Sequence, residues 1–423
     1  MIRRKVFRQP FRSRFPLMSS RVKASVVFTS MLLTIMLVVG AVIGRSEEKT
    51  DGAYRPLSVY TEVLARIKSD YVEEPDVKKV TRGALQGLVE YLDPMSSYLS
   101  AEQYSEYKER IGFQDKGRGW STGMVAHKRG MYTAVLSVLP GSPADKAGIK
   151  PGDLIEAIDD KGTRLMPPAL LYARLSGEPG SSVRVLIRSS KDYEDPVEHR
   201  LERAKIQLPA VRSEMLDGDL GLIDVSVFDD NTAAETAAAV KKLAKAGAKG
   251  LILDLRENSI GDTKLGYKLA ELFVSGKELG TLEGQRFEKQ TFTAGPKSAI
   301  TDLPLSILID RPASGAAEVA AAALLDNHRA DVIGETTYGL AAHQETIELE
   351  DGGALILSVA KFHRPDGKSL HDDGLEPNYP LEPAQLRLYR NPDQREEGYE
   401  DPFLKKAREV LNGTAEAPAA KAA

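Results

Sequence analysis

The stretch LIDRPASGAAEVAAAALLDNHRADVIGETTYGLAAHQ, residues 308–344, decides the fold of the C-terminal part of the chain. It opens on an apolar run, passes through a short turn of small residues and continues as an alanine-rich segment. This order predicts a buried strand, a sharp turn and a helix. Many hydrolases present a nucleophilic side chain at such a turn. Here Gly315 stands directly before the helix, and the turn's one hydroxyl group belongs to Ser314.

The segment upstream repeats the alternation of strand and helix. In LGLIDVSVFDDNTAAETAAAVKKLAKAGAKGLILDLREN, residues 220–258, two apolar runs flank a helical pattern. Thr232 and Glu235 form a capping box at the start of that pattern, and Gly247 ends it. The result is a βαβ unit, so we expect a multidomain α/β protein with helices packed on a mainly parallel sheet over 191–412.

The middle of the chain has a different pattern. Short β-rich runs, MYTAVLSVL and SVRVLIR, are separated by glycine and proline turns, with PGSPADKAGIKPGDLIEAIDD between them. This order resembles a PDZ domain, which we expect over 115–190. PDZ domains bind an extended peptide at a sheet edge and hold its terminal carboxylate with a loop of backbone N–H groups. The resemblance implies that the matching loop binds peptide through Trp120, Ser121, Thr122, Gly123 and Met124.

The N-terminus is basic and then apolar. Residues 1–23 carry eight Lys and Arg residues and no acid, and 24–44 carry no charge. This predicts a transmembrane anchor at 24–44 after a cytoplasmic basic segment, hence a single-pass protein of the cytoplasmic (inner) membrane with a periplasmic body. A cleaved signal peptide is the alternative interpretation. We further expect a linker at 45–56, a small helical domain at 57–114 and a disordered tail at 413–423.

Composition limits the partners. The chain has 423 residues, a formal net charge of −4 and no cysteine. So small a charge gives no reason to expect a nucleic-acid partner. The histidines show no metal-ligand spacing and no phosphate-binding motif stands out, so we expect neither a metal nor a cofactor.

Several motifs in one order resemble a known family. LDPMSSYL, the PDZ-like phrase, GLIDVSVFDDNT, GAKGLILDLREN, the stretch at 308–344 and KFHRPDGKSLHDDGLEPNY are similar to the carboxyl-terminal processing peptidases, also called tail-specific proteases. The likeness covers about 56–412. It implies cleavage of proteins near their C-termini by a serine nucleophile and a lysine general base.

The two reactive positions of that family are altered in this chain. The family's serine lies in a Ser-Ala-Ser-Ala-Ser-Glu run, its lysine 25 residues later and a glutamine four residues further on. Alignment on Glu318 puts Gly315 at the nucleophile, Leu340 at the base and Gln344 at the retained glutamine. Glycine has no hydroxyl group and leucine has no amine, so the Ser–Lys mechanism cannot run.

A nearby loop differs as well. The family's DLRNNPGG loop, which helps to form the oxyanion hole, is DLRENSIGD here, with Ile260 and Gly261 at the oxyanion-loop positions. Isoleucine does not readily adopt the positive φ that glycine allows. We interpret Asp254 and Arg256, in the same motif, as a structural pair beside the cleft.

The sequence therefore predicts a pseudoprotease that binds protein C-termini or an active homologue as an adaptor or regulator. The alternative is an active serine endopeptidase in which Ser314 is a relocated nucleophile with His343 nearby. In a purely structural interpretation of Ser314, its hydroxyl group would cap the helix that follows. The resemblance also implies self-association through 56–90 and 400–412.

Overall fold

The computed structural model describes residues 20–43, 51–111, 120–178, 180–191, 195–205, 210–390, 394–396 and 398–415. Most of the expected basic segment, most of the expected linker and most of the expected tail therefore lie outside the described residues. The chain divides into two units, Met1–Val80 and Thr81–Ala423.

The N-terminal unit contains helices α1 (Ser20–Ile43) and α2 (Asp51–Asp70) and the start of α3 (Val77–Glu90). No helix in the described residues combines the length and the apolarity needed to cross a membrane. The expected transmembrane anchor at 24–44 is therefore wrong, and so is the expected location as a single-pass inner-membrane protein with a periplasmic body. Helix α1 includes Arg21 and Lys23, and hydroxyl groups interrupt its apolar residues.

The C-terminal unit is built on a six-stranded sheet in the order β10-β11-β12-β15-β16-β19. All neighbouring pairs are parallel except β10 with β11. This confirms the expected α/β domain with a mainly parallel sheet. Its strands are β10 (Val211–Leu216), β11 (Leu220–Val225), β12 (Gly250–Asp254), β15 (Leu305–Ile309), β16 (Asp331–Gly334) and β19 (Tyr379–Pro380).

Helices cover both faces of this sheet. Along β12, Leu251 and Leu253 belong to the hydrophobic core on one face, and Ile252 belongs to the core on the other. This period of two is what a strand buried on both sides requires. One core is shared with α7 (Thr232–Lys245), α8 (Leu265–Ala270) and α9 (Ala316–Asp326), and the other with α10 (Pro383–Arg390) and α11 (Pro402–Leu411).

Helix α9 is almost entirely buried, which explains its alanine content. It contacts β15 and β16 of the parallel sheet and β13 of a second, five-stranded sheet. Small side chains let a helix lie close to both sheets. The second sheet consists of β1 (Ser97–Leu99), β13 (Glu278–Glu283), β14 (Gln290–Thr293), β17 (Ala342–Glu348) and β18 (Ala354–His363).

Strand β1 lies between α3 and α4 (Ala101–Ile111) and pairs antiparallel with β18. The segment before the PDZ-like module is thereby joined to the second sheet.

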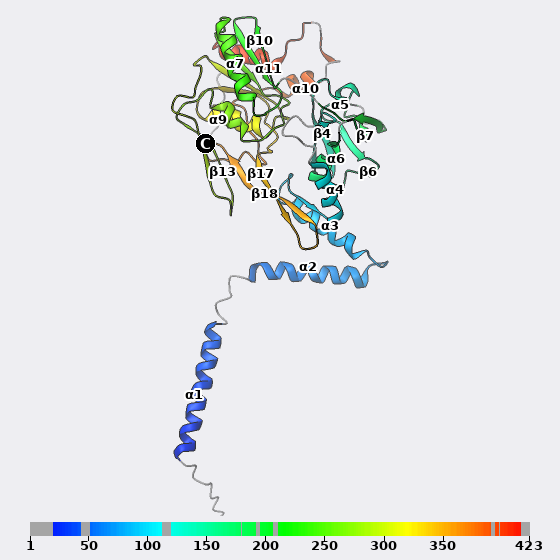
Figure 1. The fold of residues 1–423 in the computed structure, drawn as a ribbon, viewed down its shortest axis with the longest axis vertical. Coiled ribbons are helices and arrows are strands. Elements are labelled where there is room, and N and C mark those ends of the chain that lie inside the picture. The colour runs from blue at the N-terminus through cyan, green and yellow to red at the C-terminus, as the bar shows by residue number, and fades with distance from the viewer. Residues whose placement is uncertain are drawn as a thin grey trace, which may run out of the picture. The chain divides into compact units, whose positions relative to one another are not determined.

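The PDZ-like module has its own antiparallel sheet and core. The sheet order is β3-β4-β5-β7-β8, with β6 on β5. In Figure 1, α5, α6 and β7 of this module lie on the right of the body, and α7, α9 and β13 lie on the left. The elements are β2 (Trp120–Ser121), β3 (Met124–Arg129), β4 (Tyr132–Val138), α5 (Pro143–Lys146), β5 (Leu154–Ile158), β6 (Lys161–Gly162), α6 (Pro168–Leu175), β7 (Ser182–Arg188), β8 (Val197–Glu202) and β9 (Ala204–Lys205).

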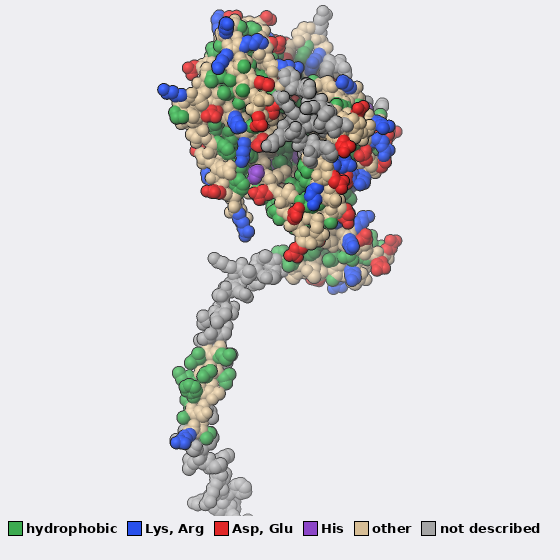
Figure 2. Space-filling view, in the orientation of Figure 1, with side chains coloured by type: hydrophobic (Ala, Val, Ile, Leu, Met, Phe, Trp, Pro, Cys, Tyr) green, Lys and Arg blue, Asp and Glu red, His purple; other side chains and the backbone are tan. Residues whose placement is uncertain are grey.

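On the face shown in Figure 2, the acidic and basic side chains of the C-terminal unit are interspersed.

Candidate active site

The turn between β15 and α9 is the centre of the candidate site. Gly315 stands at the N-cap of α9 with φ 60° and ψ −110°. Residues that carry a side chain rarely adopt this backbone conformation, whereas glycine does so with little strain. A Cβ atom built at this position would lie 3.3 Å from Thr263 Oγ1 and 3.6 Å from the carbonyl oxygen of Leu340. A side chain at this position would need a small shift of Thr263, and the backbone conformation suits glycine.

Gly315 and Leu340 are the two positions at which the sequence predicts that reactive groups are lost, and we call them the degenerate dyad after that prediction. They are neighbours in space. Glu318, in the first turn of α9, joins them: its Oε2 accepts the backbone N–H of Gly315 at 2.7 Å and that of Leu340 at 3.1 Å. Its Oε1 accepts the hydroxyl group of Thr337 and the N–H of Gly339, both at 2.6 Å. Burial raises the pKa of Glu318 to about 7, although these donors favour the charged carboxylate.

In the part of the chain that the structure describes, no hydrogen bond joins Gln344 to Gly315 or Leu340. Gln344 donates its side-chain N–H to the carbonyl oxygen of Met95 at 2.9 Å. It follows His343 at a register shift between β17 and β18. Gln344 therefore attaches this strand to the segment that precedes β1.

Ser314 and His343 are not brought together as a pair. Ser314 is 3% exposed, and its backbone N–H donates to the carbonyl oxygen of Asn258 at 2.9 Å. The ring of His343 packs against Phe287, with centroids 5.3 Å apart. Among the described residues, no hydrogen bond joins Ser314 to His343. A buried serine without a base beside it is poorly placed to act as a nucleophile.

The oxyanion-loop positions are docked against the PDZ-like module. The hydroxyl groups of Ser259 and Ser137 of β4 lie 2.9 Å apart, and Ile260 packs against a small core that includes Leu139. Ile260 keeps a negative φ, and Gly261 has φ 129°. A Cβ at Gly261 would lie 2.2 Å from the carbonyl oxygen of Phe228. Ser259 and Ile260 are thus part of the contact between the α/β domain and the PDZ-like module.

The expected peptide-binding loop is only partly described, since the side chains of Trp120 and Ser121 lie outside the described residues. Their backbone pairs with β9. Gly123 has φ 78°, as a tight turn requires, and its carbonyl oxygen accepts the N–H of Leu139. Thr122 is buried, and Met124 belongs to the core of the module. The loop is therefore shaped by turn and core contacts.

Sequence reasoning missed a buried carboxyl group next to the turn. Asp310, directly after β15, accepts the N–H groups of Glu257 at 2.9 Å and Ala313 at 3.1 Å. Burial raises its pKa to about 7. An acidic residue directly after a buried strand was the available signal. Asp310 shapes both the nucleophile turn and the oxyanion loop.

Asp254 and Arg256 form the expected structural pair. The guanidinium group of Arg256 donates to both carboxylate oxygens of Asp254 and, at 2.8 Å, to Asp401 at the start of α11. It also lies over the ring of Phe403 at 4.7 Å. The pair fastens the end of β12 to the C-terminal helices.

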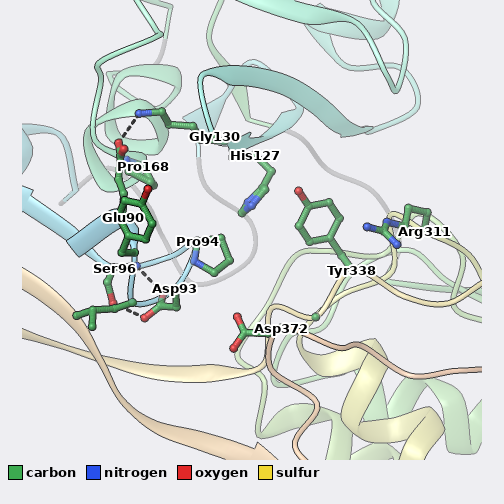
Figure 3. Close-up of a pocket in the computed structure, with 14 residues that line it drawn as sticks. Glu90, Asp93, Pro94, Ser96, His127, Gly130, Pro168, Arg311, Tyr338 and Asp372 are labelled. Carbon is green, nitrogen blue, oxygen red and sulfur yellow. Dashed lines mark hydrogen bonds and ion pairs between the residues drawn. The ribbon is translucent and has the colours of Figure 1, made fainter. Parts of the chain in front are cut away.

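A cavity of about 310 Å³ opens beside the degenerate dyad. His127 of β3 lines it, with its ring against that of Tyr338 at 4.4 Å between centroids. The same ring contacts the hydroxyl group of Tyr172 in α6 through Nδ1 at 3.2 Å. Figure 3 shows His127 facing Tyr338 across the upper part of the cavity. The PDZ-like module and the loop before Leu340 thus share an aromatic wall. No cluster of three or more metal-ligating side chains was found in the described part of the chain.

Comparisons with known proteins agree with this architecture. The sequence matches peptidase family S41 over residues 219–381 and a PDZ domain over residues 135–189. It is 34% identical over 319 residues to the carboxy-terminal processing protease CtpA of Bacillus subtilis, covering 75% of this chain and 67% of that protein. A probable CtpA-like serine protease of Staphylococcus aureus is 30% identical over 367 residues, covering 85% and 72%. The solved photosystem II D1 C-terminal processing protease has a TM-score of 0.61 at 25% identity, over 77% of this chain and 93% of that one.

Proposed function

The chain belongs to peptidase family S41, the carboxyl-terminal processing proteases with a PDZ domain, and from this premise we propose that it is a non-catalytic member that binds protein C-termini. One observation carries the proposal. At the turn where relatives need a serine stands Gly315, and beside it, where they need a lysine, stands Leu340. Neither side chain can donate a nucleophile or accept a proton.

The architecture around the degenerate dyad supports binding. Glu318 holds the two positions together through its hydrogen bonds, and Gly339, the residue before Leu340, lines the cavity. PDZ domains recognise protein C-termini along a sheet edge. Binding without cleavage suits an adaptor or regulator that acts on the bound protein or on an active homologue. Self-association through 56–90 and 400–412 stays a prediction.

The competing function is an active endopeptidase that uses Ser314. The burial of Ser314 and the packing of His343 on Phe287 weigh against it. A serine nucleophile needs a base within hydrogen-bond reach. For Ser314, the surrounding chain would have to rearrange to bring one there.

The test uses the full chain and an unstructured protein with an apolar C-terminus. Cleavage is followed by mass spectrometry, binding by fluorescence anisotropy of a labelled C-terminal peptide, and covalent reaction by a fluorophosphonate probe. We expect binding with neither cleavage nor labelling. Cleavage and labelling that disappear in Ser314→Ala would refute the proposal and establish the relocated nucleophile.

A further inference from the structure

In the wall of the cavity near the degenerate dyad, most of the charged side chains have a partner within the described residues, and one does not. It is formed by the PDZ-like module, the segment before β1 and the turns that precede Gly315 and Leu340. Its volume of about 310 Å³ falls within the range of sites that hold a small ligand or a few side chains. Its charged lining residues are Glu90, Asp93, Lys128, Arg311 and Asp372.

Each carboxylate in the cavity wall already has partners. Glu90 pairs with the buried Lys128 at 2.7 Å. Asp93 accepts the backbone N–H groups of Met95 and Ser96, both at 2.8 Å. These groups are neutralised or solvated by the protein itself, so they have little need of a ligand.

Asp372, on the opposite side of the cavity, is also paired. Its carboxylate binds Lys361 at 2.8 Å. Two of the three wall carboxylates, Glu90 and Asp372, are thus paired with a lysine, and the third, Asp93, has its oxygens hydrogen-bonded.

Arg311 is the exception. Its guanidinium group lies over the ring of Tyr338 at 5.4 Å, and it makes no hydrogen bond or ion pair with any residue that the structure describes. The ring contact covers one face of the planar group and leaves its N–H edge for another partner. Figure 3 shows Arg311 beside Tyr338 at the edge of the cavity. Among the described residues, Arg311 is therefore the charged side chain of the cavity wall that has neither a hydrogen-bond partner nor an ion-pair partner.

The position of Arg311 is defined from both modules. It follows Asp310, whose carboxylate fixes the turn through the N–H of Ala313. Its aromatic platform, Tyr338, packs against His127 of the PDZ-like module. A guanidinium group held in this way is preorganised for a carboxylate, which it binds with two parallel hydrogen bonds.

We propose that Arg311, supported by Tyr338, is the anchor for a carboxylate of a peptide bound in this cavity. The inference rests on the proposed function, because it names the chemical group that the peptide presents beside the degenerate dyad. The carboxylate belongs either to the peptide's C-terminus or to an Asp or Glu side chain. Both sources offer the same chemistry to the guanidinium group, and the experiment separates them.

The experiment measures binding of rhodamine-labelled peptides to the full chain by fluorescence anisotropy. The probe Ser-Gly-Ser-Ala-Leu-Ala is used with a free C-terminus, with a C-terminal amide, and as an amide in which the second serine is replaced by glutamate. Arg311→Gln removes the charge, and Arg311→Lys keeps the charge without the fork. Arg200→Gln is the matched control, because Arg200 is exposed on β8, at the opposite edge of the module's sheet from β3.

We expect Arg311→Gln to weaken binding of a carboxylate-bearing probe by about tenfold or more, and Arg200→Gln to leave it unchanged. Arg311→Lys is expected to give an intermediate loss. If amidation weakens wild-type binding and adds nothing to the loss in Arg311→Gln, the anchored group is the terminal carboxylate. If replacing serine by glutamate in the amidated peptide restores tight binding to the wild-type chain but not to Arg311→Gln, the anchored group is a side-chain carboxylate.

Two results would overturn the inference, and they are distinguishable. Wild-type binding that Arg311→Gln does not change, or losses from amidation and from Arg311→Gln that simply add, would show that the carboxylate is held elsewhere while the binding function stands. Failure of the wild-type chain to bind any of the three peptides would refute the proposed function and, with it, the anchor.

Discussion

At the scale of single residues, hydrogen bonds to Glu318 define the backbone of the turn at Gly315. Gly315 adopts φ 60° and ψ −110°, a conformation in which a serine would be strained. The hydrogen bonds of Glu318 hold this backbone independently of the side chain at 315. The backbone of this turn is therefore held in place without any contribution from a side chain at 315.

The degenerate dyad offers a gain-of-function prediction. A Cβ at 315 would lie 3.3 Å from Thr263 Oγ1, so a serine there requires a small shift of that side chain and strains the backbone of the turn. We expect the double substitution Gly315→Ser/Leu340→Lys to cleave a quenched fluorescent peptide, because nucleophile and base act as a unit. Neither single substitution should do so. A double variant that folds like the wild type yet stays inactive would show that the loop with Ser259 and Ile260 is also limiting.

The two buried carboxyl groups predict a pH dependence of stability. Burial raises the pKa of Asp310 and of Glu318 to about 7 from ordinary values of 3.8 and 4.5. The folded chain thus binds these protons more tightly than the unfolded chain. The resulting stabilisation is present in full below about pH 4 and is lost as the pH rises towards 7.

This is measured by urea denaturation at about pH 5 and about pH 8. Asp310→Asn keeps an oxygen that accepts the two backbone N–H groups and removes the titration, so the free energy of unfolding should fall less between the two pH values than in the wild type. The exposed Asp217→Asn serves as the control and should leave the difference unchanged. Equal pH dependence in the wild type and Asp310→Asn would contradict the assignment.

At the scale of elements, the loop after β12 and strand β4 form one contact. Ser259 and Ile260 occupy the positions at which the sequence resemblance implies proline and glycine. The hydroxyl groups of Ser259 and Ser137 are in hydrogen-bond contact, and Ile260 packs on the core with Leu139. The two residues therefore attach the loop after β12 to the PDZ-like module.

A double-mutant cycle tests this contact. We expect Ser137→Ala and Ser259→Ala to show a coupling of about 0.5–1.5 kcal/mol in the free energy of unfolding, as for one net hydrogen bond. The same cycle with Ser137→Ala and Ser306→Ala, a buried serine of β15, should show coupling near zero. Additive effects of Ser137→Ala and Ser259→Ala would mean that the two hydroxyl groups do not interact in solution.

At the scale of the whole molecule, one arginine connects the parallel sheet to the C-terminal helices. Arg256 binds Asp254 at the end of β12 and Asp401 at the N-cap of α11, with only 11% of its side chain exposed. Its burial disfavours the charge, but the adjacent carboxylates raise its pKa well above the ordinary value. The pair is part of the structure of the sheet edge.

Removal of this arginine is expected to leave the buried Asp254 and the partly buried Asp401 without a cationic partner. Arg256→Ala should lower the free energy of unfolding by about 3–5 kcal/mol in urea denaturation. Arg212 is half exposed and forms an ion pair with Asp224. Arg212→Ala should therefore change the free energy of unfolding by less than about 1 kcal/mol. Similar effects from the two substitutions would contradict a structural role for Arg256.

Much of this protein is readable from its sequence by itself. The alternation of strands and helices, the PDZ domain and the positions of Gly315 and Leu340 follow from local periodicity, turn residues and spacing, which depend on neighbours in the chain. Local patterns also mislead, as the apolar run at 24–44 did: an uncharged segment predicted a membrane anchor that the helix containing it does not support.

Only the tertiary structure decided which distant groups meet. Glu318 joins Gly315 to Leu340, and Ser137 meets Ser259 across 122 residues of chain. The packing of α9 between two sheets buries Ser314, and the modules together leave Arg311 without a charge partner among the described residues. These contacts depend on how whole elements pack, because burial and partner choice are set by three-dimensional neighbours and not by residue type or spacing along the chain.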